Sequence, residues 1–546
     1  MTDSLPRIRE SSFQANIQYR GRLLYPERGP LRHAQRLALA YEPEPARLHL
    51  LASPGLWYGL AELLASLPAD SAVLAIEADP ALAALSRSCL PEGLAASTRF
   101  AFVEGLDPGA LVGAARRLGR FRRVRLVRLS GGAAFSPGAY EKAEALLNED
   151  FSAFWKNRVS LMAMGRLWVR NIFRNLSRLD EIAPEPLSPF RKPVLLCGAG
   201  PSLELVLPLL HRCRNLLDLV AVDTAVGPLV QAGYLPDLVV CLEAQIWNLR
   251  DFLPLEGRAV PLLADLSSHP ASFKAAGGRT HLSLTAIEEG PFLRRLGALP
   301  LPFLSLPPLG SVGVHALEVV LGLAEAPVLI SGLDFAWPVG QSHARGAPAL
   351  LAAEHRRGRL CGEADFNGSF RIEAQRTPSG WLCDPVLSRY AALASELVAA
   401  RKALAPGQLL DLRGTGGLDL GLRRLSPEEA LALILSFPPP EADPQSAGPP
   451  LPNMATPASD ATLLRSIGRS FLGSELRQLI GIESILRGRL PHPGNTALRE
   501  LIASCDYLLW TQPDAHRLGE LPQDLLNRIL VEVAYWSGLL GELLRG

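Results

Sequence analysis

The residues best placed to do chemistry follow a short apolar run at residues 194–197. The run passes into a glycine-rich turn and then a leucine-rich segment from Leu203, a pattern that predicts strand, tight turn and helix. Glycine permits positive φ and a close approach of backbone to ligand, and the first N–H groups of a helix attract anions. A turn without ligand is the alternative for a lone Gly-x-Gly. We expect this turn to hold a phosphate through Gly198, Gly200, Pro201 and Ser202.

Two acidic residues follow neighbouring predicted strands. The strand predicted at 219–222 ends at Asp223 and Thr224, and the strand predicted at 238–242 ends at Glu243. In an open α/β sheet, ligands bind outside the carboxyl ends of the strands. These three side chains are therefore expected to meet the ribose or the base of the ligand. Ordinary solvation of strand ends is the alternative interpretation.

A second helix start lies at Gly310 and Ser311, before a helix predicted over 314–324. Its N–H groups offer another anion site, which we assign to the sugar or phosphate of a donor molecule. A later glycine turn, containing Gly416 and Gly417, is expected to close over the ligand.

Three candidate catalytic residues follow a strand predicted over 328–331: Asp334, His343 and Arg345. The pKa of histidine lies near neutrality, which suits general acid–base work, and arginine is a permanent cation for a phosphate or carboxylate. His355 is a second candidate histidine. A surface histidine without a catalytic role is the alternative.

The composition favours a globular, near-neutral protein. Apolar residues make up 48% and charged residues 20%, and 55 Lys and Arg face 54 Asp and Glu, which argues against a whole-protein basic footprint for nucleic acid. The seven cysteines form no Cys-x-x-Cys pair, which favours reduced thiols over disulfides or zinc. We expect a cytoplasmic protein without a secretion signal or a metal site. We also expect no membrane span, because the apolar stretch 312–333 is predicted as helix then strand.

The order of elements predicts an α/β protein of several parts. These are an α/β domain (1–150), a helical connector (151–190), a Rossmann-like central domain with a parallel sheet (191–436), a Pro-rich linker (437–459) and an α-helical domain (460–546). The last part shows helical periodicity over 461–487, 496–511 and 521–545.

The first part resembles a class I methyltransferase fold. Strands predicted at 48–52 and 73–76 flank a helix over 60–67, and the second strand leads to Glu77, where such folds bind a ribose. The turn at 53–59 lacks Gly-x-Gly. We therefore expect a degenerate domain with a structural or docking role.

Several motifs together carry a resemblance to a known family. They are Cys197-Gly-Ala-Gly-Pro-Ser-Leu203, Ala221-Val-Asp-Thr-Ala225, Leu235-Pro-Asp237, Gly310-Ser-Val312, Ile330-Ser-Gly-Leu-Asp-Phe335 and Gly414-Thr-Gly-Gly417. Their order resembles the motility accessory factor family, glycosyltransferases whose central domain is also similar to an archaeal hydroxymethylpterin diphosphokinase. The first and fifth motifs are similar to bacterial sialyltransferases, although Ala199 replaces a polar residue and no tyrosine pair lies near 330–345.

The resemblance implies transfer of a nonulosonic (sialic-acid-like) sugar from its CMP-activated form to Ser or Thr of flagellin, in support of flagellar assembly and motility. The partners are then the nucleotide sugar and flagellin, with no nucleic acid and no cofactor, and a homo-oligomer is compatible with the sequence. The chain also lacks an Asp-x-Asp diphosphate–metal motif, and a CMP-sugar leaves a monophosphate that helix N-termini can stabilise without a metal.

Two other functions stay open. The first is ATP-dependent diphosphate transfer to a pterin-like alcohol, in which Asp223, Glu243 and Asp334 would hold Mg²⁺. The second is a scaffold without catalysis that binds a nucleotide sugar or docks flagellin.

Overall fold

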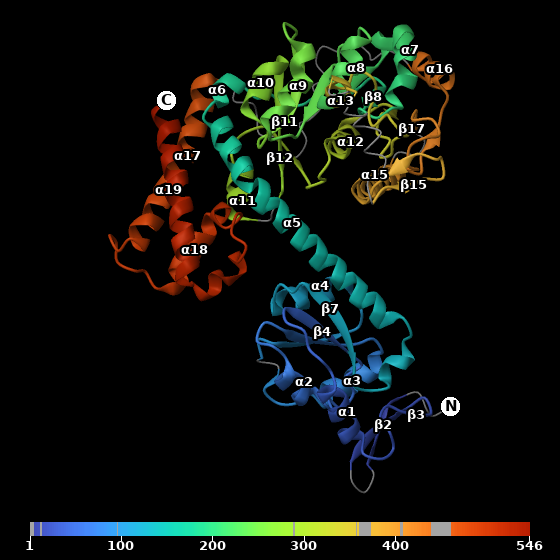
Figure 1. The fold of residues 1–546 in the computed structure, drawn as a ribbon, viewed down its shortest axis with the longest axis vertical. Helices are drawn as coiled ribbons and strands as arrows, with labels where there is room; N and C mark the ends of the chain where they lie inside the picture. The colour runs from blue at the N-terminus through green and yellow to red at the C-terminus, as the bar shows by residue number, and fades with distance from the viewer. Residues whose placement is uncertain are drawn as a thin grey trace. The chain divides into compact units, whose positions relative to one another are not determined.

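The computed structural model describes residues 5–10, 14–94, 97–287, 290–355, 358–359, 373–404, 408–437 and 460–546. Contacts within the chain divide it into two compact units, Met1–Ala163 and Met164–Gly546, and the division falls within the long helix α5 (Ala139–Leu176) (Figure 1). Each unit contains a parallel sheet, and the second ends in helices, which confirms the predicted fold class. The predicted linker lies, apart from Phe437, outside the described residues.

The first unit contains a small antiparallel sheet in the order β1-β2-β3 and a four-stranded parallel sheet in the order β6-β5-β4-β7. The strands predicted at 48–52 and 73–76 are present as β4 and β5. The elements are β1 (Arg7–Glu10), β2 (Ala15–Tyr19), β3 (Arg22–Leu23), α1 (Pro30–Leu39), β4 (Arg47–Ala52), α2 (Leu60–Ser66), β5 (Ala72–Glu77), α3 (Pro80–Ser88), β6 (Phe100–Glu104), α4 (Pro108–Leu118) and β7 (Arg123–Arg128).

Protein side chains occupy the position where this first sheet would receive a ribose. Glu77 is fully buried and accepts hydrogen bonds from the hydroxyls of Ser53 (2.6 Å) and Tyr140 (2.9 Å). The Tyr25 hydroxyl donates to the carbonyl of Pro54 and accepts from the N–H of Leu56, inside the turn that follows β4. The carboxylate that resembles a cofactor ligand is therefore satisfied by the protein itself.

The second unit is built on a nine-stranded parallel sheet in the order β13-β12-β11-β10-β9-β8-β14-β17-β18. Its elements are β8 (Val194–Cys197), α7 (Leu203–Cys213), β9 (Asp218–Val222), α8 (Val226–Gln231), β10 (Leu238–Cys241), α9 (Leu249–Phe252), β11 (Val260–Asp265), α10 (Pro270–Ala276), β12 (Gly277–Thr285), α11 (Pro291–Gly297), β13 (Phe303–Leu306), α12 (Val312–Leu323), β14 (Val328–Ser331), α13 (Pro348–His355), β15 (Gln375–Arg376), β16 (Leu382–Cys383), α15 (Pro385–Leu404), β17 (Leu409–Asp411), β18 (Arg423–Arg424) and α16 (Pro427–Ser436).

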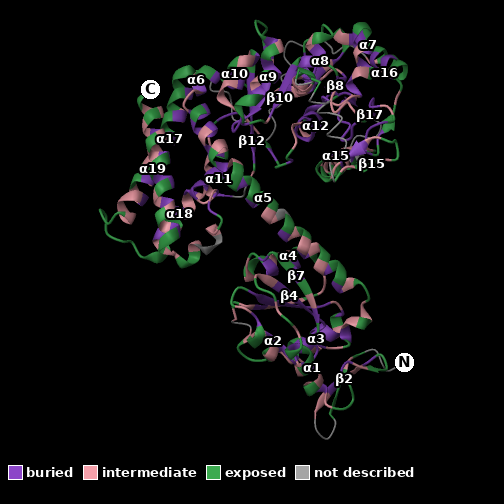
Figure 2. Ribbon diagram, in the orientation of Figure 1, coloured by how far each residue is buried: buried purple, intermediate pink, exposed green. Residues whose placement is uncertain are grey.

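The strand order reverses between β8 and β14. From β8 the chain adds strands outward through β9 to β13, then returns to place β14, β17 and β18 on the other side. Strands β8 and β10 are buried along their lengths, as Figure 2 shows, because helices cover the sheet. In such doubly wound sheets the crevice at the reversal point is where ligands bind. No helix among the described ranges is long and apolar enough to cross a membrane.

The C-terminal helices are α17 (Ala461–Leu486), α18 (Asn495–Ser504) and α19 (Gln523–Arg545). The helix predicted over 496–511 ends early, at Ser504, and a 3-10 turn over Asp506–Leu508 follows. The reason is a tertiary contact, since the Asp506 carboxylate accepts a hydrogen bond from the N–H of Phe292 at the start of α11 (2.9 Å). The C-terminal helical part, called the bundle below, therefore caps helix α11 of the central domain.

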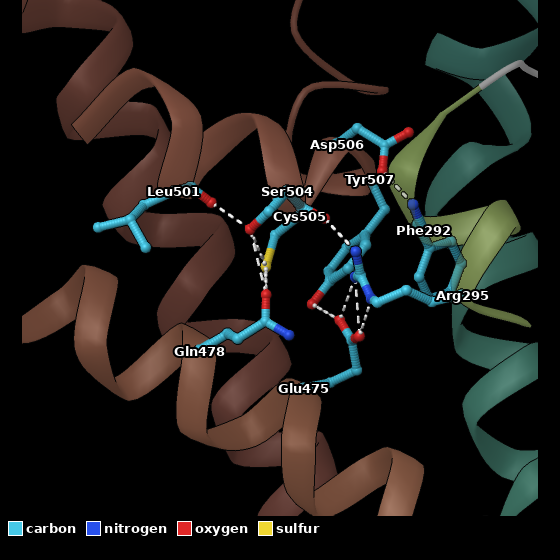
Figure 3. A network of polar contacts seen from close by, with 9 residues as sticks. All are labelled: Phe292, Arg295, Glu475, Gln478, Leu501, Ser504, Cys505, Asp506 and Tyr507. Atoms are coloured by element: carbon cyan, nitrogen blue, oxygen red, sulfur yellow. Dashed lines mark hydrogen bonds and ion pairs between the residues drawn. The ribbon is translucent and has the colours of Figure 1, made fainter. Parts of the chain in front are cut away.

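A buried ion pair joins the bundle to the same helix (Figure 3). Arg295 of α11 donates two hydrogen bonds to the carboxylate of Glu475 (2.8 and 3.0 Å) and a third to the carbonyl of Ser504 (2.6 Å). Glu475 is 1% exposed and also accepts from the hydroxyl of Tyr507. Burial raises the pKa of Glu475, and the Arg295 guanidinium opposes that shift. Glu475 thus depends on Arg295, whose side chain is 30% exposed, to compensate its buried charge.

Replacing Arg295 with methionine is expected to destabilise the chain by about 3–5 kcal/mol, because the buried Glu475 loses its counter-ion. Urea unfolding followed by tryptophan fluorescence measures this, since Trp510 and Trp536 are buried in the bundle. Arg294→Met is the matched control, because Arg294 is exposed on the same helix. Equal unfolding midpoints for the two variants would contradict a structural role for the pair.

Candidate functional site

A cavity of about 430 Å³ opens at the reversal point of the large sheet. Its walls are the loops after β8 and β14, the end of β9, and the N-terminal ends of α12 and α15. The lining residues are Gly198, Ala199, Gly200, Val222, Thr224, Ser311, Val312, Gly313, Gly332, Leu333, Asp334, Phe335, Ala336, Trp337, Ser342, His343, Asp384, Val386 and Leu387. Its size is that of a site for a small ligand.

The N-terminus of α12 supplies hydrogen-bond donors to this cavity. The first bond within the helix runs from the N–H of His315 to the carbonyl of Ser311. The preceding amides, those of Val312, Gly313 and Val314, donate to no acceptor among the described residues, and Ser311 makes no side-chain cap. No acidic residue lies in the first turn. These donors and the positive end of the helix dipole form a site for an anion.

Asp334 lines the cavity and contains a buried acceptor without a partner. One carboxylate oxygen, Oδ2, accepts a hydrogen bond from the N–H of Ser202 (2.9 Å), whereas Oδ1 is buried without a partner. Burial raises the pKa of Asp334 to about 6, and the bond from Ser202 and the charge of Arg413 oppose the shift. A buried oxygen without a partner costs free energy, so the fold holds Asp334 in place at the expense of stability.

Close packing explains the glycines of the predicted phosphate turn. A Cβ atom on Gly198 would lie within 3.0 Å of the Gly332 carbonyl, and one on Gly200 within 3.0 Å of the Asp334 carboxylate. Neither residue has positive φ; the residues with positive φ are Gly332 (69°) and Phe335 (51°) in the opposite loop. The expectation that these glycines serve a left-handed turn is wrong, and their role is to admit the loop after β14.

The N–H groups of the predicted phosphate turn are mostly used within the protein. Those of Gly198 and Gly200 bond the carbonyls of Ser331 and Gly332, and that of Ser202 bonds Asp334. The Ser202 hydroxyl accepts from the N–H of Gly332. The anion site of the cavity is therefore at α12, and Pro201 and Ser202 lie outside the lining.

A buried arginine fixes the loop that carries Asp334. Arg413, 1% exposed, donates two hydrogen bonds to Asp411 (3.0 and 2.9 Å) and one to the carbonyl of Leu333 (2.8 Å). The predicted glycine turn supports the same loop, because Gly417 packs against the backbone of Asp334.

His343 also lines the cavity. It is half-buried, and its Nδ1 lies 2.9 Å from the hydroxyl of Ser342, which is a second lining residue. The structure thus brings together these predicted residues: Gly198, Gly200, Thr224, Ser311, Asp334 and His343.

The remaining predicted residues lie outside the lining. Asp223 is buried and bonded by Thr224 and by Asn248, so its carboxylate is satisfied internally, and burial raises its pKa. Glu243 is exposed and accepts from the N–H of Gln245.

Glycines 310 and 416 pack against aromatic rings and do not face the cavity. Gly310 has a φ of 72° and bonds the Tyr390 hydroxyl through its carbonyl, whereas Gly416 packs against Trp381. Gly416 and Gly417 of the later glycine turn are not among the lining residues of the cavity.

The two other predicted polar residues point elsewhere. Arg345 has a side chain that is 80% exposed and pairs with Glu204 (3.9 Å). His355 is exposed at the end of α13.

Sequence reasoning missed the wall formed by Trp337 and by the start of α15. Asp384 caps that helix through the N–H of Leu387 (2.8 Å), and Val386 and Leu387 line the cavity. The pair Asp384-Pro385 is a helix-start signal that could have drawn attention to this segment. Among the described residues, no group of three or more His, Cys, Asp or Glu side chains could hold a metal ion.

Gly200→Ala is expected to destabilise the chain by about 1–3 kcal/mol, since its Cβ would collide with Asp334. Gly322→Ala is the control, because Gly322 lies in α12 with open space around its Cβ and should gain up to about 1 kcal/mol. Thermal unfolding of both variants measures this. Equal effects would contradict the packing account.

Asp334→Asn is expected to change how stability depends on pH. An unfolded aspartate ionises near pH 4 and the folded one near pH 6, so the wild type loses stability as pH rises between these values. The variant lacks this loss and should be more stable by about 1–3 kcal/mol at pH 7.5, but nearly equal at pH 4. Urea unfolding at both pH values measures the gap. A gap that does not change with pH would show that Asp334 is not buried as described.

Comparison with known proteins finds one matching family model and several relatives of this chain. Residues 168–340 match the family model described as 6-hydroxymethylpterin diphosphokinase MptE-like. A protein of Treponema pallidum (strain Nichols), named as uncharacterized, is 30% identical over 366 residues. That match spans 65% of this chain and 63% of the relative, so the chain covers less than two thirds of its length. A second uncharacterized protein of the same organism is 26% identical over 128 residues, 23% of this chain and 61% of the relative.

The fold also has a solved counterpart. The MAf glycosyltransferase from Magnetospirillum magneticum AMB-1 superposes with a TM-score of 0.55 at 13% identity, over 99% of this chain and 90% of that one. The resemblance inferred from the motifs is thereby confirmed at the level of domain and fold. Residues 168–340 of the chain are thus similar to the MptE-like family, and the chain as a whole shares the fold of the MAf glycosyltransferase.

Proposed function

We propose that this chain is a glycosyltransferase that moves a nonulosonic acid from a CMP-activated donor to Ser or Thr of flagellin. The observation that carries the proposal is the cavity at the strand reversal, where the unbonded amides of α12 lie among the lining residues Asp334 and His343. An anionic group of a ligand would satisfy these amides. The fold shared with a MAf glycosyltransferase supports the same reaction class.

The cavity suggests a role for each lining group. The phosphate of the donor binds at Ser311 and Gly313, where the helix dipole stabilises the charge that develops as CMP leaves. Asp334 accepts the N–H of Ser202 and so positions the loop after β14 beside the donor. His343 takes the proton of the acceptor hydroxyl as that oxygen bonds the anomeric carbon and the bond from that carbon to the phosphate oxygen breaks.

Diphosphate transfer from ATP is the second candidate, and the MptE-like match over 168–340 favours it. This reaction requires Mg²⁺ on the triphosphate, and Asp334 and Asp384 are the carboxylates that line the cavity. The two functions predict different ligands. A glycosyltransferase should bind CMP without Mg²⁺, and a diphosphokinase should bind ATP with Mg²⁺.

Ser311→Asp is expected to abolish stabilisation by CMP. The new carboxylate repels a phosphate at the α12 amides, yet acidic N-caps stabilise helices, so the fold should keep or gain stability. Thermal unfolding at about 100 times the Kd of CMP should show about 2.7 kcal/mol of added stability in the wild type and little in the variant.

Ser311→Asn is the matched control for this variant, because it is neutral and caps equally well. It should retain most of the CMP effect. Stabilisation by CMP in both variants would contradict phosphate binding at α12. Stabilisation only by ATP with Mg²⁺ would favour the diphosphokinase over the glycosyltransferase.

A further inference from the structure

The two edge strands of the four-stranded parallel sheet, β7 and β6, differ in whether their outward backbone groups are hydrogen-bonded. At the β7 edge, side chains of α5 bond the outward backbone: the N–H of Val124 donates to Asn148 and that of Leu126 to Glu144, both at 2.9 Å. Side chains that occupy edge amides in this way block the addition of another strand. The β7 edge is therefore closed.

The β6 edge has no such cover. The N–H of Val73 bonds the carbonyl of Arg99, and the N–H of Gly105 bonds that of Glu77, so the odd-numbered residues from 99 to 105 face β5. In a parallel ladder the intervening residues then direct their N–H and carbonyl groups outward. Those residues are Phe100, Phe102 and Glu104, whose backbone groups have no partner among the residues that the structure describes.

A groove of about 380 Å³ runs along this open edge. Phe100 and Phe102 form part of its floor. Arg87 and Leu90, at the end of α3, line one side, and Arg117 and Leu118, at the end of α4, line the other. The groove therefore lies beside the outward backbone groups of β6, where an added strand would pair.

The positive side chains that line the groove favour an acidic occupant. Arg117 is exposed and has no acidic partner among the described residues. Arg87 lies over the ring of Phe102 and pairs with Glu104, which is the acidic residue at this edge. One guanidinium thus stands on each face of the strand position, and at least one is available to a carboxylate of a partner.

We propose that the β6 edge binds an extended, acidic polypeptide segment of a partner protein as a fifth strand. The bonds to Phe100, Phe102 and Glu104 come from the backbone of the segment, and its carboxylates reach Arg117 and Arg87. Because successive side chains of a strand point to opposite faces, the two acidic residues are adjacent or three apart. This binding surface is independent of the cavity and of the proposed transferase activity.

The test uses the full chain and three fluorescent octapeptides of valine and threonine. The first has two adjacent glutamates, the second has lysines in their place, and the third is the first with every backbone amide N-methylated, which blocks both edges of the strand. Fluorescence anisotropy gives the Kd of each. We expect the acidic peptide to bind, and both other peptides to bind at least tenfold more weakly, because one loses the charges and the other the strand bonds.

The variants Arg117→Glu and Arg123→Glu form a matched pair. Both residues are exposed arginines at an edge of the same sheet, but Arg123 lies on β7, the closed edge. Arg117→Glu should weaken the acidic peptide at least tenfold and Arg123→Glu less than twofold, with equal thermal unfolding. On binding, hydrogen exchange should slow at the amides of Phe100, Phe102 and Glu104.

Three results would overturn the proposal. One is absence of binding by the acidic peptide. Another is binding that N-methylation leaves unchanged, which would indicate charge attraction without strand addition. The third is a dimer in sedimentation that Arg117→Glu dissociates, which would assign the edge to a second copy of the chain.

Discussion

The contact between the loops after β8 and β14 is the constraint on which the site depends. Asp334 accepts the N–H of Ser202 across this contact, and glycines at 198, 200 and 332 let the two backbones meet without Cβ atoms between them. Because these loops belong to the two strands at the reversal point, their packing determines the shape of the crevice. It also buries the Asp334 carboxylate and leaves one of its oxygens without a partner.

A parallel sheet whose strand order reverses beside its first strand appears twice in this chain, with opposite outcomes. In the first unit, Ser53 and Tyr140 bond Glu77, and Tyr25 enters the turn after β4, so protein groups satisfy the ligand position. In the second unit the corresponding crevice is open and lined by the unbonded amides at the start of α12. Side-chain identity in the loops, rather than the fold, therefore decides which sheet can bind a ligand.

Strand and helix positions were largely predictable because hydrophobic periodicity is a local signal. The strand expected at 328–331 is present with those bounds, and the helices expected at 461–487 and 521–545 differ by one or two residues. Partners distant in sequence were not predictable. Ser202 was expected to hold a phosphate but bonds Gly332, and Arg345 turns to Glu204, because tertiary contacts of the β14 loop compete for both residues. The helix expected to reach residue 511 stops at Ser504 for a similar reason, the cap that Asp506 gives to α11.

The most direct measurement of the central claim is the mass of flagellin after incubation with this chain and a CMP-activated nonulosonic acid. The account predicts that the mass of flagellin increases by one or more sugar residues, with one CMP released for each, and that Asp334→Ala and His343→Ala greatly reduce the yield. Unchanged flagellin, together with AMP formation from ATP and a hydroxymethylpterin by the same preparation, would contradict it.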